Sequence, residues 1–276
     1  MLVSIVTPSF KQLKWLKLCA ASIADQEGPA HEHIVQDAGT GPQLESWANS
    51  VPEMKLFVEK DNGMYDAINR GLRRARGDIL AYLNCDEQYL PNVLAQVVSF
   101  FAENPEVKVL FGDSILVDIN GKPLSYRRTV LPTLSHVHHV QLNAPTCSMF
   151  FRRALIDRGF LFDPQLKIIG DQVWVEELLR SNVKMGVLNQ PLAVFTFTGE
   201  NLSSGVAAEE EAIQRRGRLS LLGKLQNAGR VIWYRIRKLF AGAYWIRELD
   251  VAIYTLDAPA TRQRKRAKVG FFWRES

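Results

Sequence analysis

Hydrophobic residues in the first third of the chain alternate between two spacings. A short β-branched run over residues 2–7 ends at Pro8, and apolar residues then recur at the three- and four-residue steps of a helix. The same succession repeats over residues 33–47 and 55–75, before a fourth apolar run covers residues 78–83. This alternation predicts right-handed βαβ units and a mostly parallel sheet with helices on both faces.

The later pattern predicts further elements of the same kind. Helices are expected over residues 91–103 and 170–181, and residues 119–122 are typical of a hairpin turn. Residues 129–151 contain no Asp, Glu, Lys or Arg, but their prolines and histidines argue against a membrane-spanning helix and favour loop and strand. Further strands are expected near residues 107–112, 183–188 and 192–197.

Length and cysteine content limit the class of protein. With 276 residues, 47% of them hydrophobic, the chain can form one large α/β domain and an appendage. Cys19, Cys85 and Cys147 are isolated, so we expect neither a disulfide framework nor a zinc site, and a reducing cytosolic setting fits best. The first residues enter an apolar strand directly, so no secretory signal is expected.

Charge is divided unevenly along the chain. Residues 1–211 hold 19 Lys and Arg against 25 Asp and Glu, a net charge of −6, whereas residues 212–276 hold 15 against 4, a net charge of +11. Such asymmetry predicts a polyanionic neighbour for the basic end, either a membrane surface or nucleic acid.

Polar residues follow four of the predicted strands. In open α/β sheets, ligands bind beyond the carboxyl ends of the strands, and each of these four segments carries groups suited to a nucleotide. A dinucleotide-dependent dehydrogenase is excluded because the chain has no G-x-G-x-x-G segment. The four segments are residues 8–11, 37–40, 60–62 and 84–87.

The order of these features resembles the family 2 glycosyltransferases, particularly small bacterial cell-envelope enzymes, over residues 1–204. Each motif is weak alone, but together and in this order they are specific. The motifs are VSIVTPSF at residues 3–10, QDAGT at 36–40, EKDNGMYDAINRG at 59–71, GDILAYLNCDE at 77–87 and GD at 170–171, with FFRR at 150–153 and FD at 162–163 on the acceptor side.

The resemblance implies a GT-A fold, with a Rossmann-like, mostly parallel central sheet and helices on both faces. The expected catalytic domain covers residues 1–205, divided into a nucleotide-binding half at 1–90 and an acceptor-side half at 91–205. The implied activity is inverting transfer of one sugar from a nucleoside-diphosphate donor, with UDP favoured, to a glycan or lipid-linked acceptor in surface polysaccharide synthesis.

A nucleoside needs a flat apolar wall and a group that reads the edge of its base. Asp37, at the carboxyl end of a strand, can accept a hydrogen bond from a base N–H, while Pro8 and Phe10 can form the wall. The resemblance implies the same roles. Asp37 equally fits a residue that caps the turn after it, so both interpretations stay open.

Asp61 and Asn69 are further candidates for donor binding. Asp61 precedes a helix and can be its N-cap, and in the matching family segment this aspartate helps to hold the nucleoside. Asn69 lies on the helix that follows and can face the donor.

The segment from Asn84 to Asp86 stands where the family has its Asp-x-Asp motif. The resemblance implies that Mg²⁺ or Mn²⁺ binds Asp86 and both donor phosphates, offsetting charge as the nucleoside diphosphate departs. Asn84 replaces the first acid, and Glu87 stands where a second aspartate is common, which puts metal dependence in question. A loop aspartate that bonds backbone amides is the structural alternative.

Asp171 is the candidate general base. An inverting transfer needs a carboxylate opposite the leaving diphosphate to take the acceptor hydroxyl's proton, and such bases contribute about 10²- to 10⁴-fold. Its place at a helix start after Gly170 resembles that of the family base, although Val173 stands where a further aspartate is common. An ordinary N-cap is the alternative.

Residues 206–276 are expected to form a basic amphipathic helical extension. Its apolar and aromatic residues recur at helical steps from Ile232 to Ile246, with cations between them. Such a helix can lie in the headgroup plane of an anionic membrane, making a cytoplasmic protein peripheral. It can equally pack on its own domain or on a second subunit. Residues 262–268 are predicted to be a solvated tail, and no nucleic acid partner is expected.

Three histidines at residues 136, 138 and 139 invite comparison with a metal site. Strand alternation would place His136 and His138 on one side, but no cysteine or spaced acid accompanies them, so no structural metal is expected. Contact with an acceptor glycan, or no role, fits them better.

Two other functions compete with glycosyl transfer. A sugar nucleotidyltransferase would share the sheet but needs a Gly-rich, basic triphosphate loop, which residues 8–12 lack. A non-catalytic nucleotide-sugar-binding or scaffolding protein is compatible with Asn84 and Val173.

Overall fold

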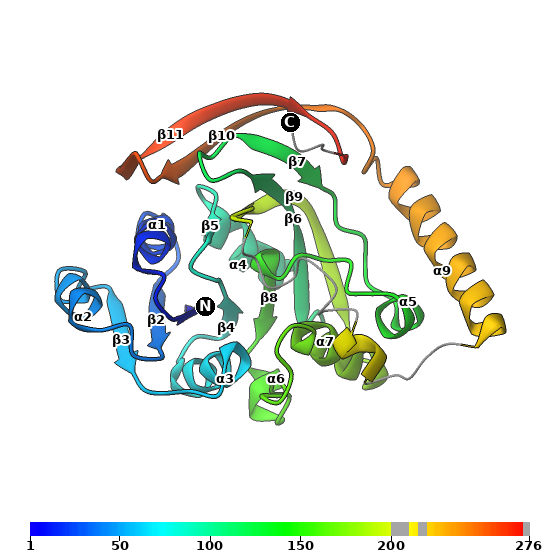
Figure 1. Cartoon of the computed structure of the whole chain (residues 1–276), viewed down its shortest axis with the longest axis horizontal. Coiled ribbons are helices and arrows are strands. Elements are labelled where there is room, and N and C mark those ends of the chain that lie inside the picture. Colours follow the sequence, from blue (N-terminus) through cyan, green and yellow to red (C-terminus); the bar gives the residue numbers. More distant parts are fainter. Residues whose placement is uncertain (200–209, 215–219, 273–276) are drawn as a thin grey trace.

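The computed structural model describes residues 1–199, 210–214 and 220–272, and places most of them in or around one large sheet (Figure 1). The first half of the chain alternates strands and helices, as the apolar periodicity predicts. Its elements are β1 (Val3–Ser9), α1 (Leu13–Ala24), β2 (His31–Asp37), α2 (Pro42–Ala48), β3 (Met54–Val58), α3 (Met64–Arg74), β4 (Ile79–Tyr82), β5 (Glu87–Tyr89) and α4 (Val93–Glu103).

The second half adds mixed strands and the acceptor-side helices. These elements are β6 (Val109–Val117), β7 (Pro123–Arg127), α5 (Leu134–His139), a 3₁₀ turn at Thr146–Ser148, β8 (Met149–Arg152), α6 (Ala154–Asp157), α7 (Gly170–Arg180) and β9 (Met185–Thr196). The last elements are α9 (Leu221–Phe240), β10 (Arg247–Thr255) and β11 (Ala258–Val269).

The main sheet has the order β3-β2-β1-β4-β8-β6-β9-β5, with β7 paired to β6. Strands β1 to β4 are parallel to one another, whereas β8 runs antiparallel to both β4 and β6. The polar segments after β1, β2, β3 and β4 therefore meet at one edge of the sheet. The mostly parallel α/β fold expected from the sequence is confirmed.

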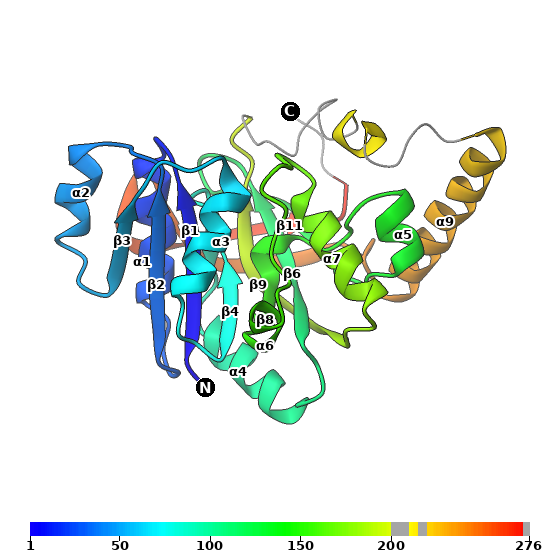
Figure 2. The same ribbon diagram turned by 90° about the horizontal axis from the view of Figure 1, so that it is seen from below.

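Each face of the sheet has its own apolar core. Val3 and Ile5 of β1 join the cluster that contains residues of α1 and α4, whereas Val6 joins the cluster of α3 and α7. This follows from the two-residue period of a strand, which sends neighbouring side chains to opposite faces. The view in Figure 2 shows α3 and α7 lying side by side across one face.

The structure differs from three local predictions in the second half of the chain. The two strands expected at 183–188 and 192–197 form one strand, β9, whose register with β6 shifts near Pro191. Residues 129–151, expected to be loop and strand, contain the short helix α5. His136 and His138 therefore lie on a helix and not on a strand.

The basic extension is only partly helical. After α9, strands β10 and β11 form an antiparallel hairpin that arches over α1 and β5 (Figure 1). The solvated tail expected at residues 262–268 is wrong, because these residues lie in β11. Composition hid this strand, since five of the seven residues at 262–268 are Lys or Arg.

Specific contacts hold the hairpin on the nucleotide half. Arg262 makes two hydrogen bonds to the Asp25 carboxylate at 2.5 and 2.7 Å, and the Tyr254 hydroxyl donates to it at 2.8 Å. Gln88 exchanges two hydrogen bonds with the Tyr254 backbone. Val251, Ile253 and Val269 belong to the same apolar cluster as β1 and α4. The hairpin is therefore part of the core of the molecule.

Membrane insertion was not expected from the sequence. Within the part of the chain that the structure describes, no helix is both long enough and apolar enough to cross a bilayer.

Candidate active site

A cavity of about 550 Å³ opens at the carboxyl edge of the parallel strands. Six of the eight predicted site residues line it, so the folded chain brings together groups that are up to 163 positions apart. The six are Pro8, Phe10, Asp61, Asn84, Asp86 and Asp171.

The wall beyond β1 is formed by Pro8 and Phe10. The Phe10 ring is 53% exposed, and the Lys11 ammonium lies 4.9 Å from its centroid. Lys11 has a left-handed φ of 56°, and its N–H donates to the Thr40 hydroxyl at 2.7 Å, which fixes the loop after β1. An accessible aromatic face at this edge suits stacking against a flat base.

Asp37 is fully buried and does not line the cavity, although its neighbour Ala38 does. Its carboxylate accepts N–H bonds from Gly39 at 2.8 Å and Thr40 at 2.6 Å, and the Thr40 hydroxyl also donates to it at 2.6 Å. These bonds match the turn-capping alternative raised by the sequence. Base recognition by Asp37 stays a prediction.

Asn69 also lies away from the cavity. Its side-chain amide donates to the Phe162 carbonyl at 2.7 Å and accepts the Phe162 N–H at 3.0 Å, so the backbone of the acceptor-side half satisfies both ends of it. Asn69 is 3% exposed. In this position it ties α3 to the segment that leads to Asp171, and contact with a donor stays a prediction.

Asp61 lies in the loop before α3 and accepts the Gly63 N–H at 2.9 Å. One of its two carboxylate oxygens makes this bond. Because Asp61 also lines the cavity, its carboxylate can accept the Gly63 N–H and a hydrogen bond from a bound nucleoside at the same time.

The segment after β4 gathers oxygen atoms in one place. The Asn84 N–H donates to Glu87 at 2.8 Å, while the buried Asn84 Oδ1 has no hydrogen-bond partner in the structure. Glu87 is 2% exposed, and burial, followed by the charge of Asp86, raises its pKa to about 8. Burial therefore favours the protonated form of Glu87.

These residues fit a divalent cation held mainly by its substrate. The Asp86 carboxylate and the unpaired Asn84 oxygen are hard ligands of the kind that Mg²⁺ and Mn²⁺ accept. Among the described residues, no group of three or more His, Cys, Asp or Glu side chains could hold a metal. Diphosphate oxygens and water would have to complete the coordination.

Asp171 is the second residue of α7, on the other side of the cavity. The Gln172 N–H donates to its carboxylate at 2.7 Å, and the Tyr65 hydroxyl lies 3.4 Å from it while donating to the Ile168 carbonyl at 2.8 Å. Burial raises the Asp171 pKa to about 6, although the Gln172 hydrogen bond lowers it. A carboxylate in this range is suited to general base catalysis near neutral pH.

Gly170 allows the start of α7 to pack closely against Tyr65 of α3. A Cβ at this position would lie 2.5 Å from the Tyr65 ring, so the residue before Asp171 has no room for a side chain. The tight packing keeps the start of α7 against α3.

Two cavity residues, Tyr65 and Lys167, and one supporting residue, Glu211, were missed by sequence reasoning. The Lys167 ammonium donates to the Asn62 carbonyl and joins the acceptor-side loop to the donor-side loop. Glu211 accepts the N–H groups of Lys167, Ile168 and Ile169 at 2.7, 2.9 and 2.9 Å. No local signal identifies Glu211, because its partners lie more than 40 positions earlier in the chain.

The histidines take separate roles. His136 is buried against the Tyr234 ring, with centroids 4.2 Å apart, and His138 bonds Glu176 at 2.8 Å. Neither lines the cavity that contains Asp171.

Comparison with known proteins places the chain in a family. The sequence pattern described as Glycosyl transferase family 2 matches residues 4–159, which is more than half of the chain. The chain belongs to glycosyl transferase family 2. It is 25% identical over 233 residues to Rv1514c, an uncharacterised glycosyltransferase of Mycobacterium tuberculosis, covering 81% of this chain and 83% of that protein.

Another glycosyltransferase is similar over a shorter stretch. A PGL/p-HBAD biosynthesis glycosyltransferase of Mycobacterium bovis is 32% identical over 123 residues, or 42% of this chain and 48% of that protein.

Solved structures share the fold of this family 2 chain. Residues 1–349 of Staphylococcus aureus TarS, in complex with UDP-GlcNAc, align with a TM-score of 0.60 and 19% identity, covering 75% of this chain and 62% of that one. The mannosyltransferase PcManGT of Pyrobaculum calidifontis, in complex with GDP-Man and Mn²⁺, aligns with a TM-score of 0.53 and 15% identity, covering 87% and 82%. The expected GT-A fold and glycosyltransferase class are confirmed.

Proposed function

We propose that this glycosyltransferase moves one sugar, with inversion, from a UDP-sugar to a glycan or lipid-linked acceptor in bacterial surface polysaccharide synthesis. The observation that carries the proposal is that Asp86 and Asp171 line one cavity of about 550 Å³. Such a volume suits a small polar ligand with an apolar base. The TarS complex with UDP-GlcNAc supports the choice of uridine.

The donor end of the cavity binds the nucleotide. Phe10 stacks on the base, and Asp61 accepts a hydrogen bond from the nucleoside. Asp86 and the Asn84 oxygen would hold Mg²⁺ or Mn²⁺, and the ion would offset negative charge on the leaving diphosphate. Lys60 and Lys167 line the same cavity and add positive charge.

The acceptor end of the cavity performs the proton transfer. Asp171 takes the proton of the acceptor hydroxyl, whose oxygen forms a bond to the anomeric carbon of the sugar. The bond from that carbon to the diphosphate oxygen breaks on the opposite face, so the configuration inverts. Because its pKa is about 6, Asp171 is mostly ionised at neutral pH.

The exposed side of α9 is proposed to lie against an anionic membrane. Leu225, Trp233 and Phe240 are at least 61% exposed on this helix. Arg235 on the same helix can contact lipid phosphate. This placement would bring a lipid-linked acceptor to the enzyme at the cytoplasmic face. A second subunit covering α9 would instead appear as a dimer in solution.

The test compares nucleotide release by the purified full chain. UDP-, GDP- and dTDP-sugars are supplied with Mg²⁺ or Mn²⁺ and with glycan or lipid-linked acceptors. Asp171→Asn should lower kcat about 10²- to 10⁴-fold with little change in donor affinity. Asp86→Asn should weaken metal-dependent donor binding. The matched control Asp157→Asn removes an exposed acid of α6, outside the cavity, and should behave as wild type.

Two results would contradict the proposal. Wild-type turnover by Asp171→Asn would exclude this residue as the base. Thermal stabilisation by a nucleotide sugar, without nucleotide release for any acceptor, would favour the non-catalytic binding protein.

A further inference from the structure

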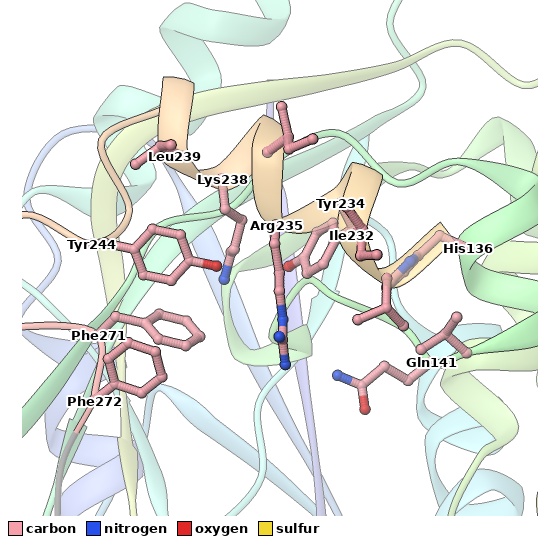
Figure 3. Close-up of a pocket in the computed structure, with 13 residues that line it drawn as sticks. His136, Gln141, Ile232, Tyr234, Arg235, Lys238, Leu239, Tyr244, Phe271 and Phe272 are labelled. Carbon is pink, nitrogen blue, oxygen red and sulfur yellow. The ribbon is translucent and has the colours of Figure 1, made fainter. Parts of the chain in front are cut away.

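A second cavity, of about 690 Å³, lies between α9, the end of α5 and the segment after β11 (Figure 3). It does not share residues with the cavity that contains Asp171. Its volume lies in the range of ligand-binding pockets. The proposed transfer reaction gives it no role.

Basic groups converge on this cavity. Lys238 and His136 are each 4% exposed, and Arg235 extends into the space between the Phe271–Phe272 side and Gln141 (Figure 3). Neither ring nitrogen of His136 has a hydrogen-bond partner in the structure. The described residues that line the cavity include no carboxylate. A buried cation in a cavity without a lining carboxylate favours an anionic ligand, although the charge of Asp113, outside the cavity, also acts on Lys238.

The protonation states are consistent with an anion. Burial lowers the Lys238 pKa to about 8, with a contribution from the charge of Arg127, so the ammonium still carries its charge at neutral pH. Burial lowers the His136 pKa to about 4, which leaves a neutral ring with one N–H to donate. A nearby anion would favour the charged form of Lys238.

The rest of the cavity is apolar and aromatic. Tyr244, Phe271 and Phe272 pack together with ring centroids 5.0 to 5.8 Å apart. The Lys238 ammonium lies 4.4 Å from the Phe271 centroid, so the cation and the apolar wall adjoin. Ile232 and Leu239 of α9 extend this wall and are themselves exposed.

The surrounding contacts are specific. Asn227 of α9 donates to the His139 carbonyl at 2.8 Å, and Arg230 bonds Ser135 at 2.7 Å, so α9 is fixed on α5. In turn, Gln172 of α7 donates to the Val137 carbonyl of α5 at 2.7 Å. The helix that carries His136 is therefore bonded to the helix that carries Asp171.

We propose that this cavity binds a single amphiphile with a phosphate head and an apolar chain. The phosphate oxygens accept hydrogen bonds from Arg235, Lys238 and His136, and the chain lies along Phe271 and Phe272. Arginine is suited to this role because its planar guanidinium donates two parallel bonds to phosphate. Two sources share this chemistry, a phospholipid of the bilayer and the lipid phosphate of a carrier-linked acceptor.

Calorimetric titration of the full chain with dodecyl phosphate, below its micelle concentration, tests the site without any glycosyl transfer. We expect saturable binding of one molecule per chain. Lys238→Met and Arg235→Gln should each weaken it about tenfold or more, because a hydrogen bond to a charged group is lost. Lys224→Met is the matched control, since it removes a charge from α9 outside the cavity.

Three results would overturn the proposal. These are no saturable binding, equal binding of dodecyltrimethylammonium, and equal weakening by Lys224→Met. Arg235 is exposed, so its variant keeps the test decisive if Lys238→Met unfolds.

Vesicle sedimentation separates the two sources. If a bilayer phospholipid fills the site, less Lys238→Met than wild type should sediment with phosphatidylcholine vesicles that contain phosphatidylglycerol. If Lys238→Met loses dodecyl phosphate binding but still binds the vesicles, the ligand is a single carrier lipid phosphate. Both results support the site, and neither depends on the outcome for Asp171.

Discussion

Glu211 offers the sharpest test of how the basic extension supports the site. Its carboxylate accepts three consecutive backbone N–H groups, those of Lys167, Ile168 and Ile169, and Asp171 follows two positions later. The Ile168 carbonyl in turn accepts the Tyr65 hydroxyl. Glu211→Gln keeps the shape of the side chain but removes its charge and leaves one acceptor oxygen for three donors.

The expected effect follows from the hydrogen bonds. A bond to a charged group contributes about 1.5–3 kcal/mol and a neutral one about 0.5–1.5 kcal/mol, so Glu211→Gln should loosen the loop by about 1–3 kcal/mol. If the loop must be closed to place Asp171, kcat falls roughly 5- to 150-fold. The Glu211 charge also raises the Asp171 pKa, so its removal should move the acidic limb of the pH profile to lower pH.

The assay is kcat and kcat/KM against pH for wild type, Glu211→Gln and the neighbouring control Glu210→Gln, whose side chain is exposed. The control should match wild type in both rate and profile. A folded Glu211→Gln protein with wild-type kcat and an unmoved acidic limb would refute the positioning role.

Other predictions follow from the same structure. Because Asp171 must be ionised to act as a base and its pKa is raised to about 6, kcat/KM should rise with pH and reach half its plateau near that value; a flat profile between pH 5 and 7 would contradict this. Gly170→Ala should lower the free energy of unfolding by about 1–3 kcal/mol in urea, because its Cβ would meet the Tyr65 ring. Arg262→Ala should lower the free energy of unfolding by about 1–3 kcal/mol in the same assay. Arg264→Ala, at an exposed ion pair, should lower it by less than about 1 kcal/mol. If Arg262→Ala lowers it no more than Arg264→Ala does, the contact of Arg262 with Asp25 at the end of α1 is not stabilising.

Elements with a local signal were predicted well from the sequence. The strands β1 and β4 are short apolar runs ended by polar residues, so both their positions and the site at their carboxyl ends could be inferred. Asp86, in the segment after a strand, and Asp171, near the start of a helix, were found because these positions also resemble motifs of the family.

Partners that depend on folding could not be predicted in this way. A polar side chain that bonds backbone looks the same in sequence as one that bonds a ligand, which is why Asp37 and Asn69 were grouped with the cavity residues. The strand β11 was hidden by its cations, and Glu211 reaches its partners only after the chain has folded back.

The hairpin has a consequence for how the protein is made. Val251, Ile253 and Val269 complete a core begun by Val3 and Ile5, so the ribosome delivers these pieces of the core only after residues 1–246 have been synthesised. Until the hairpin is synthesised, the nascent nucleotide half exposes apolar surface, and such a state is prone to aggregation. Shortening the gene after β9 would make that state permanent, and a stable smaller enzyme should not be obtained by cutting there.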